Sequence, residues 1–343
     1  MSGARRGAAL ALAALMLSLS ACSSAPKKEE ETLFAMDTVM SLTLYGDNAR
    51  DALAQATDTL EQLDELWSPT QEDSQIWAVN HSGGSWTTVD GETSVLLQQS
   101  LELCQITDGA LDITAYPAVE AWGFPSGDYR VPAQAELDQL ASRIDYSQVE
   151  LAGNRVRLPA TMSLDLGAVA KGWAGELLSQ QLSEAGIKSA LLDLGQSTIQ
   201  TVGTKPDGSP WRIGIQDPAG ESYLGILELT GQAMGTSGDY QRYFEQDGVR
   251  YCHIIDPATA APARSGVRSV TVVSSSALNC DALSTALFVI GTEKGVAFWR
   301  EHPELDFQAL WIGEDGTITL TKGLQSSFSL AQGYEDREVQ VVS

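Results

Sequence analysis

The stretch Asp281-Ala282-Leu283-Ser284-Thr285-Ala286-Leu287 lies in an apolar run whose length and Ala/Leu content predict a buried helix over residues 277–290. On a helix, Asp281 and Thr285 are four residues apart and share one face. A carboxylate and a hydroxyl one turn apart offer two oxygen ligands to a hard cation such as Mg²⁺. The same residues also suit a helix start, with Asp281 as a capping residue and Thr285 bonded to its own helix. The pattern predicts the helix and leaves both roles open.

Two further motifs lie just upstream of this helix, and one of them contains a histidine. They are Gly235-Thr236-Ser237-Gly238 and His253-Ile254-Ile255-Asp256-Pro257. The chain has 3 histidines, and His253 is the one that lies among the motifs. With an ordinary pKa of about 6.5, it could act as a general base near neutral pH. The alternative is a strand histidine whose ring is satisfied by structural hydrogen bonds.

Composition and charge limit the classes of protein. The 343 residues are 43% hydrophobic and 19% charged, as in a globular protein with ample core. No shift in composition marks a second domain. The net charge of −24 argues against nucleic acid and anionic membrane surfaces as partners. An acidic protein that handles a phosphorylated substrate needs a local cation, which favours the metal role for Asp281.

Residues 1–22 are predicted to be a targeting segment rather than part of the fold. Arg5 and Arg6 precede an apolar stretch over 8–19 that is too short to span a bilayer comfortably. The following Leu19-Ser20-Ala21-Cys22 resembles a bacterial lipoprotein cleavage site, with Cys22 as the lipidated residue. An ordinary signal peptide cut after Ala21 and an uncleaved anchor are the alternatives.

This targeting segment sets the expected domain organisation and location. Residues 23–31 are predicted to form a polar tether, and residues 32–343 a single domain. We expect an exported protein, anchored by lipid alone to the outer face of the bacterial cell membrane or on its periplasmic side. The three remaining cysteines match no zinc spacing and are expected to be buried free thiols rather than disulfides: Cys104, Cys252 and Cys280.

Hydrophobic periodicity predicts an α+β fold, because helices and strands mix without strict βαβ alternation. Predicted helices cover residues 51–67, 91–107, 133–144, 164–185, 277–290 and 293–301. Predicted strands cover 33–45, 211–216, 224–229, 249–255, 267–273, 307–312 and 317–320, with a hairpin over 149–158 and two strands within 189–202. Lys171 lies in the first turn of its predicted helix, where the helix dipole disfavours a cation unless something negative lies nearby. A helix N-terminus after a glycine turn is also a common anion site.

Read in order, the motifs resemble the ApbE family, whose members are FAD:protein FMN transferases. The similarity spans nearly the whole chain after residue 22. It rests on Met36-Asp37-Thr38, Gly109 with Asp112, Trp122-Gly123-Phe124, Asp165-Leu166-Gly167-Ala168 with Lys171-Gly172, Thr236-Ser237-Gly238, His253 with Asp256-Pro257, and Asp281 with Thr285. The chain departs from many members at Gly195-Gln196-Ser197, where a Gly-Gly-Asn turn or similar is usual.

The resemblance implies a fold related to the T-fold, with FAD in a cleft between two sub-structures. It implies Mg²⁺ ligands at Asp281, Thr285 and the carbonyl of Ala168, and a general base at His253. Trp67 would take the place of the aromatic residue that stacks on the flavin. The implied FAD contacts are Met36, Trp67, Ala121, Trp122, Gly123, Asp165, Lys171 and Ile255.

The activity implied is Mg²⁺-dependent transfer of FMN from FAD to a threonine hydroxyl of an acceptor protein, with release of AMP. The family suggests an exported electron-transport subunit as the acceptor. One alternative is a Mg²⁺-dependent FAD pyrophosphatase that yields FMN and AMP. The other is a flavin-binding lipoprotein without turnover. His253, Asp281 and Thr285 together favour an enzyme, because storage of FAD needs neither a base nor a metal.

Overall fold

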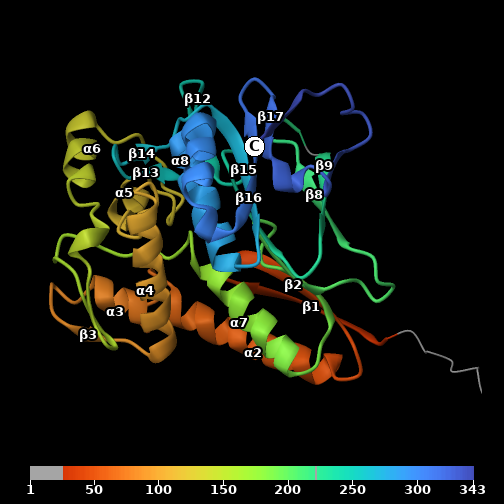
Figure 1. Ribbon diagram of the computed structural model, residues 1–343. Coiled ribbons are helices and arrows are strands. Elements are labelled where there is room, and N and C mark those ends of the chain that lie inside the picture. The colour runs from red at the N-terminus through yellow and green to blue at the C-terminus, as the bar shows by residue number, and fades with distance from the viewer. Residues whose placement is uncertain (1–25, 221) are drawn as a thin grey trace, which may run out of the picture.

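A computed structural model describes residues 26–220 and 222–343 of the chain (Figure 1). The predicted targeting segment, including Cys22, and the first part of the tether lie outside the described residues. The fold is built on a nine-stranded sheet in which neighbouring strands are antiparallel, except for the parallel pair β17–β19. In spatial order its strands are β1 (Lys28–Ala35), β2 (Thr38–Tyr45), β6 (Ser189–Asp193), β7 (Thr198–Gly203), β10 (Ala233–Gly238), β15 (Val267–Ser274), β16 (Phe307–Gly313), β17 (Ile318–Thr321) and β19 (Val339–Val342).

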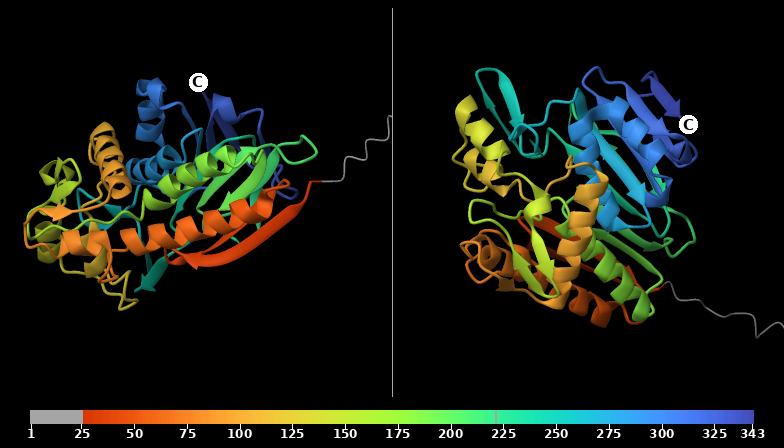
Figure 2. Two further views of the ribbon diagram at one scale, coloured as in Figure 1. Left: turned by 90° about the horizontal axis from the view of Figure 1, so that it is seen from below. Right: turned by 60° about the vertical axis from the view of Figure 1, so that its left-hand side comes forward.

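The two faces of this sheet are covered by different layers. Helices α2 (Ala49–Trp67), α7 (Ala170–Glu184) and α8 (Ala277–Glu301) pack on one face (Figures 1 and 2). A small sheet of β8 (Trp211–Gln216), β9 (Tyr223–Leu229) and β18 (Phe328–Leu330) packs on the other. Side chains on β10 alternate between the layers, as a strand requires: Ala233 joins the cluster under α8, and Met234 joins the cluster under β9.

A lobe beside the helical layer contains the remaining elements. Its helices are α3 (Gln75–Asn80), α4 (Gly91–Ile106), α5 (Tyr116–Ala121) and α6 (Gln134–Ala141). Its strands are β3 (Thr87–Thr88), β4 (Glu150–Ala152), β5 (Arg155–Arg157), β11 (Tyr243–Gln246), β12 (Val249–Cys252), β13 (Ile255–Asp256) and β14 (Ala261–Pro262). A separate hydrophobic cluster, with Trp122, Phe124 and Ile255 among its members, joins α5 and α6 to the β13–β14 hairpin.

The single strand predicted over 33–45 is in fact a hairpin. Met36 and Asp37 both have positive φ, 50° and 59°, and connect β1 to β2 as a two-residue turn. This is the conformation that a tight hairpin requires, and Asp tolerates it better than most residues. Strand β1 begins at Lys28, opposite Tyr45, so residues 28–31 of the predicted tether belong to the sheet. The tether prediction was wrong there because β2 supplies pairing partners to a polar sequence.

The predicted helices are present, with shifted boundaries at two functional segments. Helix α7 begins at Ala170 rather than near 164, because Val169 has a non-helical φ of −139°. Gly291, at φ 80°, interrupts α8 between the two helices predicted on either side of it. The strand predicted over 249–255 ends at Cys252, and Ile255 pairs with Pro262 instead. Across residues 26–220 and 222–343, no helix is long and apolar enough to cross a membrane.

The three described cysteines are free thiols in the protein interior, as predicted. Burial raises the pKa of Cys104 to about 12 and that of Cys252 to about 11. These thiols are therefore protonated at neutral pH and have a packing role.

Candidate active site

Asp281 is a buried carboxylate near the start of α8, with only 6% of its surface exposed. Its Oδ2 atom accepts a hydrogen bond from the Gly172 amide at 2.9 Å, and its Oδ1 atom accepts one from Thr198 Oγ1 at 3.0 Å. No Lys, Arg or His in the described part of the chain forms an ion pair with it. A buried carboxylate is costly unless it is compensated. The Gly172 amide and the Thr198 hydroxyl compensate the charge of Asp281 in part. Each carboxylate oxygen can still bind a cation or accept a further hydrogen bond.

Two glycines allow the chain to approach Asp281 this closely. A Cβ atom on Gly172 would lie 2.4 Å from the Ala277 carbonyl oxygen and 2.8 Å from Asp281 Cβ. A Cβ atom on Gly235 would lie 2.3 Å from the Cys280 carbonyl oxygen. Helix α7 and strand β10 therefore contact α8 at glycine residues, backbone to backbone. The α7–α8 contact brings the Gly172 amide within hydrogen-bond distance of the Asp281 carboxylate.

The helix-capping role considered for Asp281 belongs to another residue. Ser276 is the N-cap of α8, and its side chain accepts a hydrogen bond from the Asn279 amide. Thr285 lies one turn beyond Asp281, and its Oγ1 is 3.1 Å from Ser237 Oγ on β10. Its distance to the Asp281 carbonyl oxygen is 3.5 Å, at the limit for a hydrogen bond. The Thr285 hydroxyl is thus held mainly from β10.

The carbonyl of Ala168 is left without a partner by the bond between Gly172 and Asp281. In a regular helix the Gly172 amide would donate to the carbonyl four residues earlier, which is that of Ala168. It donates to Asp281 instead, and no hydrogen bond among residues 26–220 and 222–343 ends on the Ala168 oxygen. A carboxylate, a hydroxyl and a free carbonyl are the oxygen donors that Mg²⁺ prefers.

These donors fit Mg²⁺ only as part of a larger ligand set. Within the described residues there is no group of three or more His, Cys, Asp and Glu that could form an all-protein metal site. Mg²⁺ commonly keeps several waters and binds through one or two carboxylates together with substrate phosphates. The donor set around Asp281 has that composition.

His253 directly follows β12 and is held by a neighbouring strand end. Its amide lies 3.0 Å, and its Nδ1 atom 3.2 Å, from the Arg242 carbonyl oxygen. The ring meets Phe124 edge-on, with centroids 6.4 Å apart. Burial, and then the positive charges of Arg242 and Lys171, lower the pKa of His253 to about 4. The expectation of an ordinary pKa was wrong, because a sequence does not show which charges surround a ring.

Lys171 and Asp165 lie together at the start of α7. The Asp165 Oδ1 atom accepts a hydrogen bond from the Gly167 amide at 2.8 Å, and Lys171 Nζ donates to the Gly167 carbonyl at 3.2 Å. Burial raises the pKa of Asp165, while this amide, Lys171 and Arg242 oppose the shift. Neither Lys171 nor Arg242 forms an ion pair within residues 26–220 and 222–343. Their charge is available to an anionic ligand.

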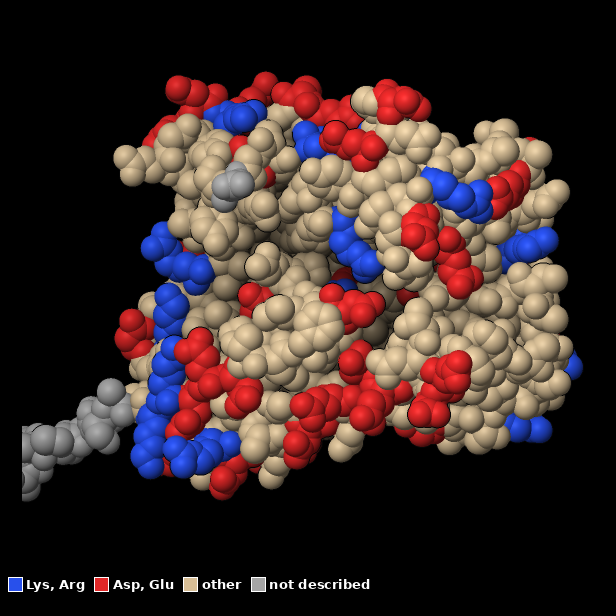
Figure 3. Space-filling view, turned by 180° about the vertical axis from the view of Figure 1, so that it is seen from behind, with Lys and Arg blue, Asp and Glu red and all other residues tan. Residues whose placement is uncertain are grey.

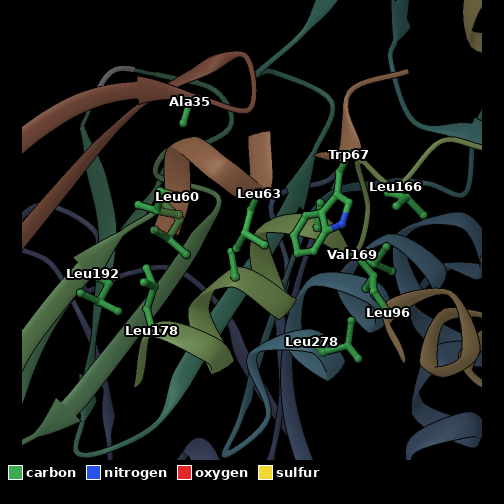
Figure 4. Packing of buried hydrophobic residues seen from close by; sticks show 14 of the residues in the cluster. Ala35, Leu60, Leu63, Trp67, Leu96, Leu166, Val169, Leu178, Leu192 and Leu278 are labelled. Atoms are coloured by element: carbon green, nitrogen blue, oxygen red, sulfur yellow. The ribbon is translucent and has the colours of Figure 1, made fainter. Parts of the chain in front are cut away.

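Trp67 does not lie where the resemblance implied. Its side chain is 3% exposed, and its Nε1 atom donates to Thr93 Oγ1 at 3.0 Å. Figure 4 shows the indole in the core among Leu63, Leu96 and Val169. A ring buried in this way cannot stack on a flavin in this conformation. Trp67 ends α2 on the same buried face as Leu60 and Leu63, so it belongs to the core.

The segment 121–123 is held by internal hydrogen bonds, since the amides of Trp122 and Gly123 donate to the Ala118 and Glu120 carbonyls. The indole of Trp122 is 2% exposed, and its Nε1 atom donates to the Ala260 carbonyl at 2.9 Å. Gly123 has φ 83°, and a Cβ atom there would lie 2.2 Å from the Asp128 carbonyl oxygen. Ala121 ends α5. The Trp122 indole therefore anchors this segment to the loop at Ala260.

Of the remaining predicted contacts, Met36 lies in the β1–β2 turn and Ile255 lies in strand β13. The Met36 amide donates to Asp64 Oδ1 at 2.9 Å, which holds the β1–β2 turn to α2. Ile255 is 7% exposed and packs with Trp122 in the lobe's cluster.

The face opposite to that of Figure 1 is hollowed near its middle, and acidic and basic side chains lie around the hollow (Figure 3).

The unusual turn at 195–197 packs beside the β1–β2 hairpin. Gly195 has φ 86°, and a Cβ atom there would lie 2.4 Å from Thr38 Cγ2. Gln196 has φ 64°, and its amide donates to Asp193 Oδ1 at 2.6 Å. Glycine is required at position 195 because a Cβ atom there would overlap Thr38. The Asp193 carboxylate stabilises the positive-φ backbone of Gln196.

Two residues of this site were missed from the sequence. Thr198 bonds to Asp281 from β7, and nothing in its strand pattern distinguishes it. Arg242 forms no ion pair among the described residues, and the sequence does not distinguish it from Arg250, the other cation between the same two motifs. Asp112 braces a turn through Thr114 and Tyr146, and Asp239 pairs with Arg268.

The fold and the site together define an α+β protein with a polar site where its helical layer meets the lobe. The chain belongs to the ApbE family, whose model matches residues 36–310. The FAD:protein FMN transferase of Vibrio cholerae is 36% identical over 245 residues, which are 69% of this chain and 73% of that protein. The FAD:protein FMN transferase of Treponema pallidum is 35% identical over 292 residues, 80% of each chain.

Solved structures confirm the predicted α+β fold. The ApbE protein of Thermotoga maritima superposes with a TM-score of 0.82 at 31% identity, covering 88% of this chain and 99% of that one. The apo flavinyl transferase ApbE of Pseudomonas stutzeri gives a TM-score of 0.78 at 31% identity, covering 89% and 98%.

Proposed function

We propose that this chain is a Mg²⁺-dependent FAD:protein FMN transferase that modifies a threonine of an acceptor protein. Membership of the ApbE family supports the transferase activity. The observation that carries the metal dependence is the buried Asp281 carboxylate, which has no cationic side-chain partner among the described residues. Its hydrogen bond from the Gly172 amide leaves the Ala168 carbonyl without a partner.

In the proposed reaction one phosphorus–oxygen bond forms and one breaks. The acceptor oxygen forms a bond to the phosphorus of the FMN half of FAD, and the bond from that phosphorus to the bridging oxygen breaks. AMP leaves with the bridging oxygen, and the hydroxyl proton passes to a base. Mg²⁺, when bound, neutralises charge on the diphosphate.

Each site residue has a role in this step. Asp281, Thr285 and the Ala168 carbonyl would hold the metal. Lys171 supplies positive charge at the start of α7, where the helix dipole also favours an anion. His253 is neutral at neutral pH, since its pKa lies near 4, and so it can accept the proton from the acceptor hydroxyl. The backbone of 121–123, with Met36 and Ile255, shapes the site for FAD.

A FAD pyrophosphatase is the second candidate, because the same residues would serve water as the acceptor. Mg²⁺, when bound, would lower the pKa of water, so hydrolysis would depend less on a base than transfer to threonine does.

The targeting segment supports the proposed location, and the resemblance to the ApbE family supports the proposed acceptor. A protein exported and held by lipid at Cys22 would meet acceptors on the same side of the membrane. We therefore propose an exported electron-transport subunit as the acceptor. A variant that begins at Ser23 is expected to stay monodisperse without detergent, and recovery only in detergent would contradict the lipid-anchor proposal.

The deciding experiment incubates the protein with FAD, MgCl₂ and an acceptor protein or peptide containing a threonine. Mass spectrometry of the acceptor and chromatography of the nucleotides are read together. Transfer predicts one FMN adduct for each AMP released, and no adduct when the threonine is replaced by valine. AMP and free FMN without any adduct would establish the pyrophosphatase, and FAD bound without AMP would establish simple binding.

A further inference from the structure

Arg242 lies at the base of the β11–β12 hairpin, directly opposite His253. The hairpin register pairs Tyr243 with Cys252, so the next pair is Arg242 with His253. The Arg242 carbonyl oxygen is within hydrogen-bond distance of both the His253 amide, at 3.0 Å, and the ring atom Nδ1, at 3.2 Å. One backbone oxygen therefore fixes both the backbone and the ring of His253.

This contact sets the position of the ring proton. A carbonyl oxygen can only accept, so Nδ1 must carry the hydrogen when the bond forms. In the neutral ring the lone pair then lies on Nε2. A general base that receives a proton from an acceptor hydroxyl needs that free nitrogen, and the wrong tautomer would present an N–H group instead.

The guanidinium of Arg242 joins two parts of the site. Its Nη2 atom donates to the Phe124 carbonyl at 3.2 Å, and the group is otherwise exposed. The other charges that act on this region are Lys171 on α7, Asp165 just before α7, and Asp37 in the β1–β2 turn. Arg242 has no carboxylate partner among the described residues, so its remaining N–H groups are free.

We propose that Arg242 is a positioning residue for the transfer reaction: its carbonyl holds the Nδ1–H tautomer of His253, and its guanidinium, with Lys171, binds the diphosphate of FAD. This inference rests on the proposed function for the identity of the anion. The geometry at His253 does not depend on that identity. A fork of guanidinium N–H groups matches phosphate oxygens better than an ammonium does.

The tautomer is tested directly by ¹⁵N NMR of the full chain without FAD. The chain contains 3 histidines, so comparison with His253→Gln assigns the ring signals. The expected result is a proton on Nδ1 and an unprotonated Nε2 for His253 at neutral pH. A proton on Nε2 would overturn the tautomer part of the proposal, whatever the activity of the protein.

The charge is tested with Arg242→Gln, Arg242→Lys and a control, Arg250→Gln. Arg250 lies on the same hairpin but pairs with Glu245 and stacks on Tyr243, on the face away from His253. Removing the Arg242 charge should raise the NMR titration midpoint of His253 by about half a pH unit or more. Arg242→Lys should keep the low midpoint, and Arg250→Gln should not move it. An unchanged midpoint in Arg242→Gln would overturn the electrostatic role.

Ligand binding completes the test and separates this inference from the proposed function. The dissociation constant of FAD should rise about tenfold in Arg242→Gln, less in Arg242→Lys, and not in Arg250→Gln. Riboflavin, which lacks the diphosphate, should show no such difference. Equal loss for riboflavin and FAD would overturn the diphosphate contact. If the transferase activity itself is absent, the NMR and binding results still decide the role of Arg242.

Discussion

The amide of Gly172 donates a hydrogen bond to Oδ2 of Asp281 across the contact of α7 and α8, at 2.9 Å. This bond takes an amide out of its own helix and gives it to a carboxylate on another. It thereby leaves the Ala168 carbonyl free and orients Asp281 at the same time.

Replacing Asp281 by Asn should nearly abolish FMN transfer, with a loss of about 10²-fold or more. Asn can still accept from Gly172 and donate to Thr198, so the fold should survive while the ligand charge is lost. The assay is FMN transfer titrated with MgCl₂, with and without EDTA. Asp112→Asn, a buried acid that braces a turn, is the control and should keep its Mg²⁺ dependence. Full activity of Asp281→Asn at ordinary Mg²⁺ would show that the metal site lies elsewhere.

Gly172→Ala should destabilise the protein by about 1–3 kcal/mol, because the new methyl overlaps the Ala277 carbonyl and Asp281. The measurement is the urea midpoint and the slope of unfolding. Gly91→Ala is matched to it: Gly91 is also in the first turn of a helix, but its Cβ would meet nothing within 4 Å. That control should be neutral or slightly stabilising. Equal behaviour of the two variants would contradict the close approach of α7 and α8.

Trp67→Phe should lower stability and leave the affinity for FAD unchanged. The substitution keeps an aromatic ring in the core but removes the hydrogen bond to Thr93, at a cost of about 1 kcal/mol in addition to lost packing. Thermal unfolding and FAD titration by fluorescence measure the two effects. A tenfold weaker binding of FAD in a well-folded variant would restore Trp67 as a flavin contact.

The pH profile of transfer should lack an ionisation near 6.5. Because the pKa of His253 is lowered to about 4, the free enzyme keeps its base unprotonated down to mildly acidic pH. The acid limb of kcat/KM should therefore lie well below that of free histidine. His253→Gln should lose transfer by about 10²-fold and lose this limb, while FAD hydrolysis falls less. A parallel fall of both activities would assign His253 to binding or structure.

The lowered pKa of His253 also predicts how stability depends on pH. Between about 6.5 and the folded value of about 4, the unfolded chain binds a proton that the folded chain does not. Stability that this ring contributes above 6.5 should therefore be lost as the pH falls through that window. Urea midpoints of the wild type and of His253→Gln are compared at pH 7.5 and about 4.5. The wild type should lose more than the variant, and an equal loss would contradict the shift.

Much of the fold could be predicted from the sequence, because periodicity is a local property. The helical repeat over 51–67 predicted α2, and the apolar run that contains Asp281 predicted the first part of α8. Asp281 and Thr285 could be assigned to one face because four residues make about one turn. The order of motifs was enough to indicate the family, since each motif is a short contiguous stretch.

Only the tertiary structure decided which groups meet and what they do. Thr198, Gly172 and Asp281 lie on three elements, and their hydrogen bonds require the packing of α7 and β7 against α8. The pKa of His253 depends on burial and on the charges of Arg242 and Lys171, which come from different parts of the chain. Burial and Coulomb interactions act through space, so a linear sequence can name these residues but cannot place them beside one another.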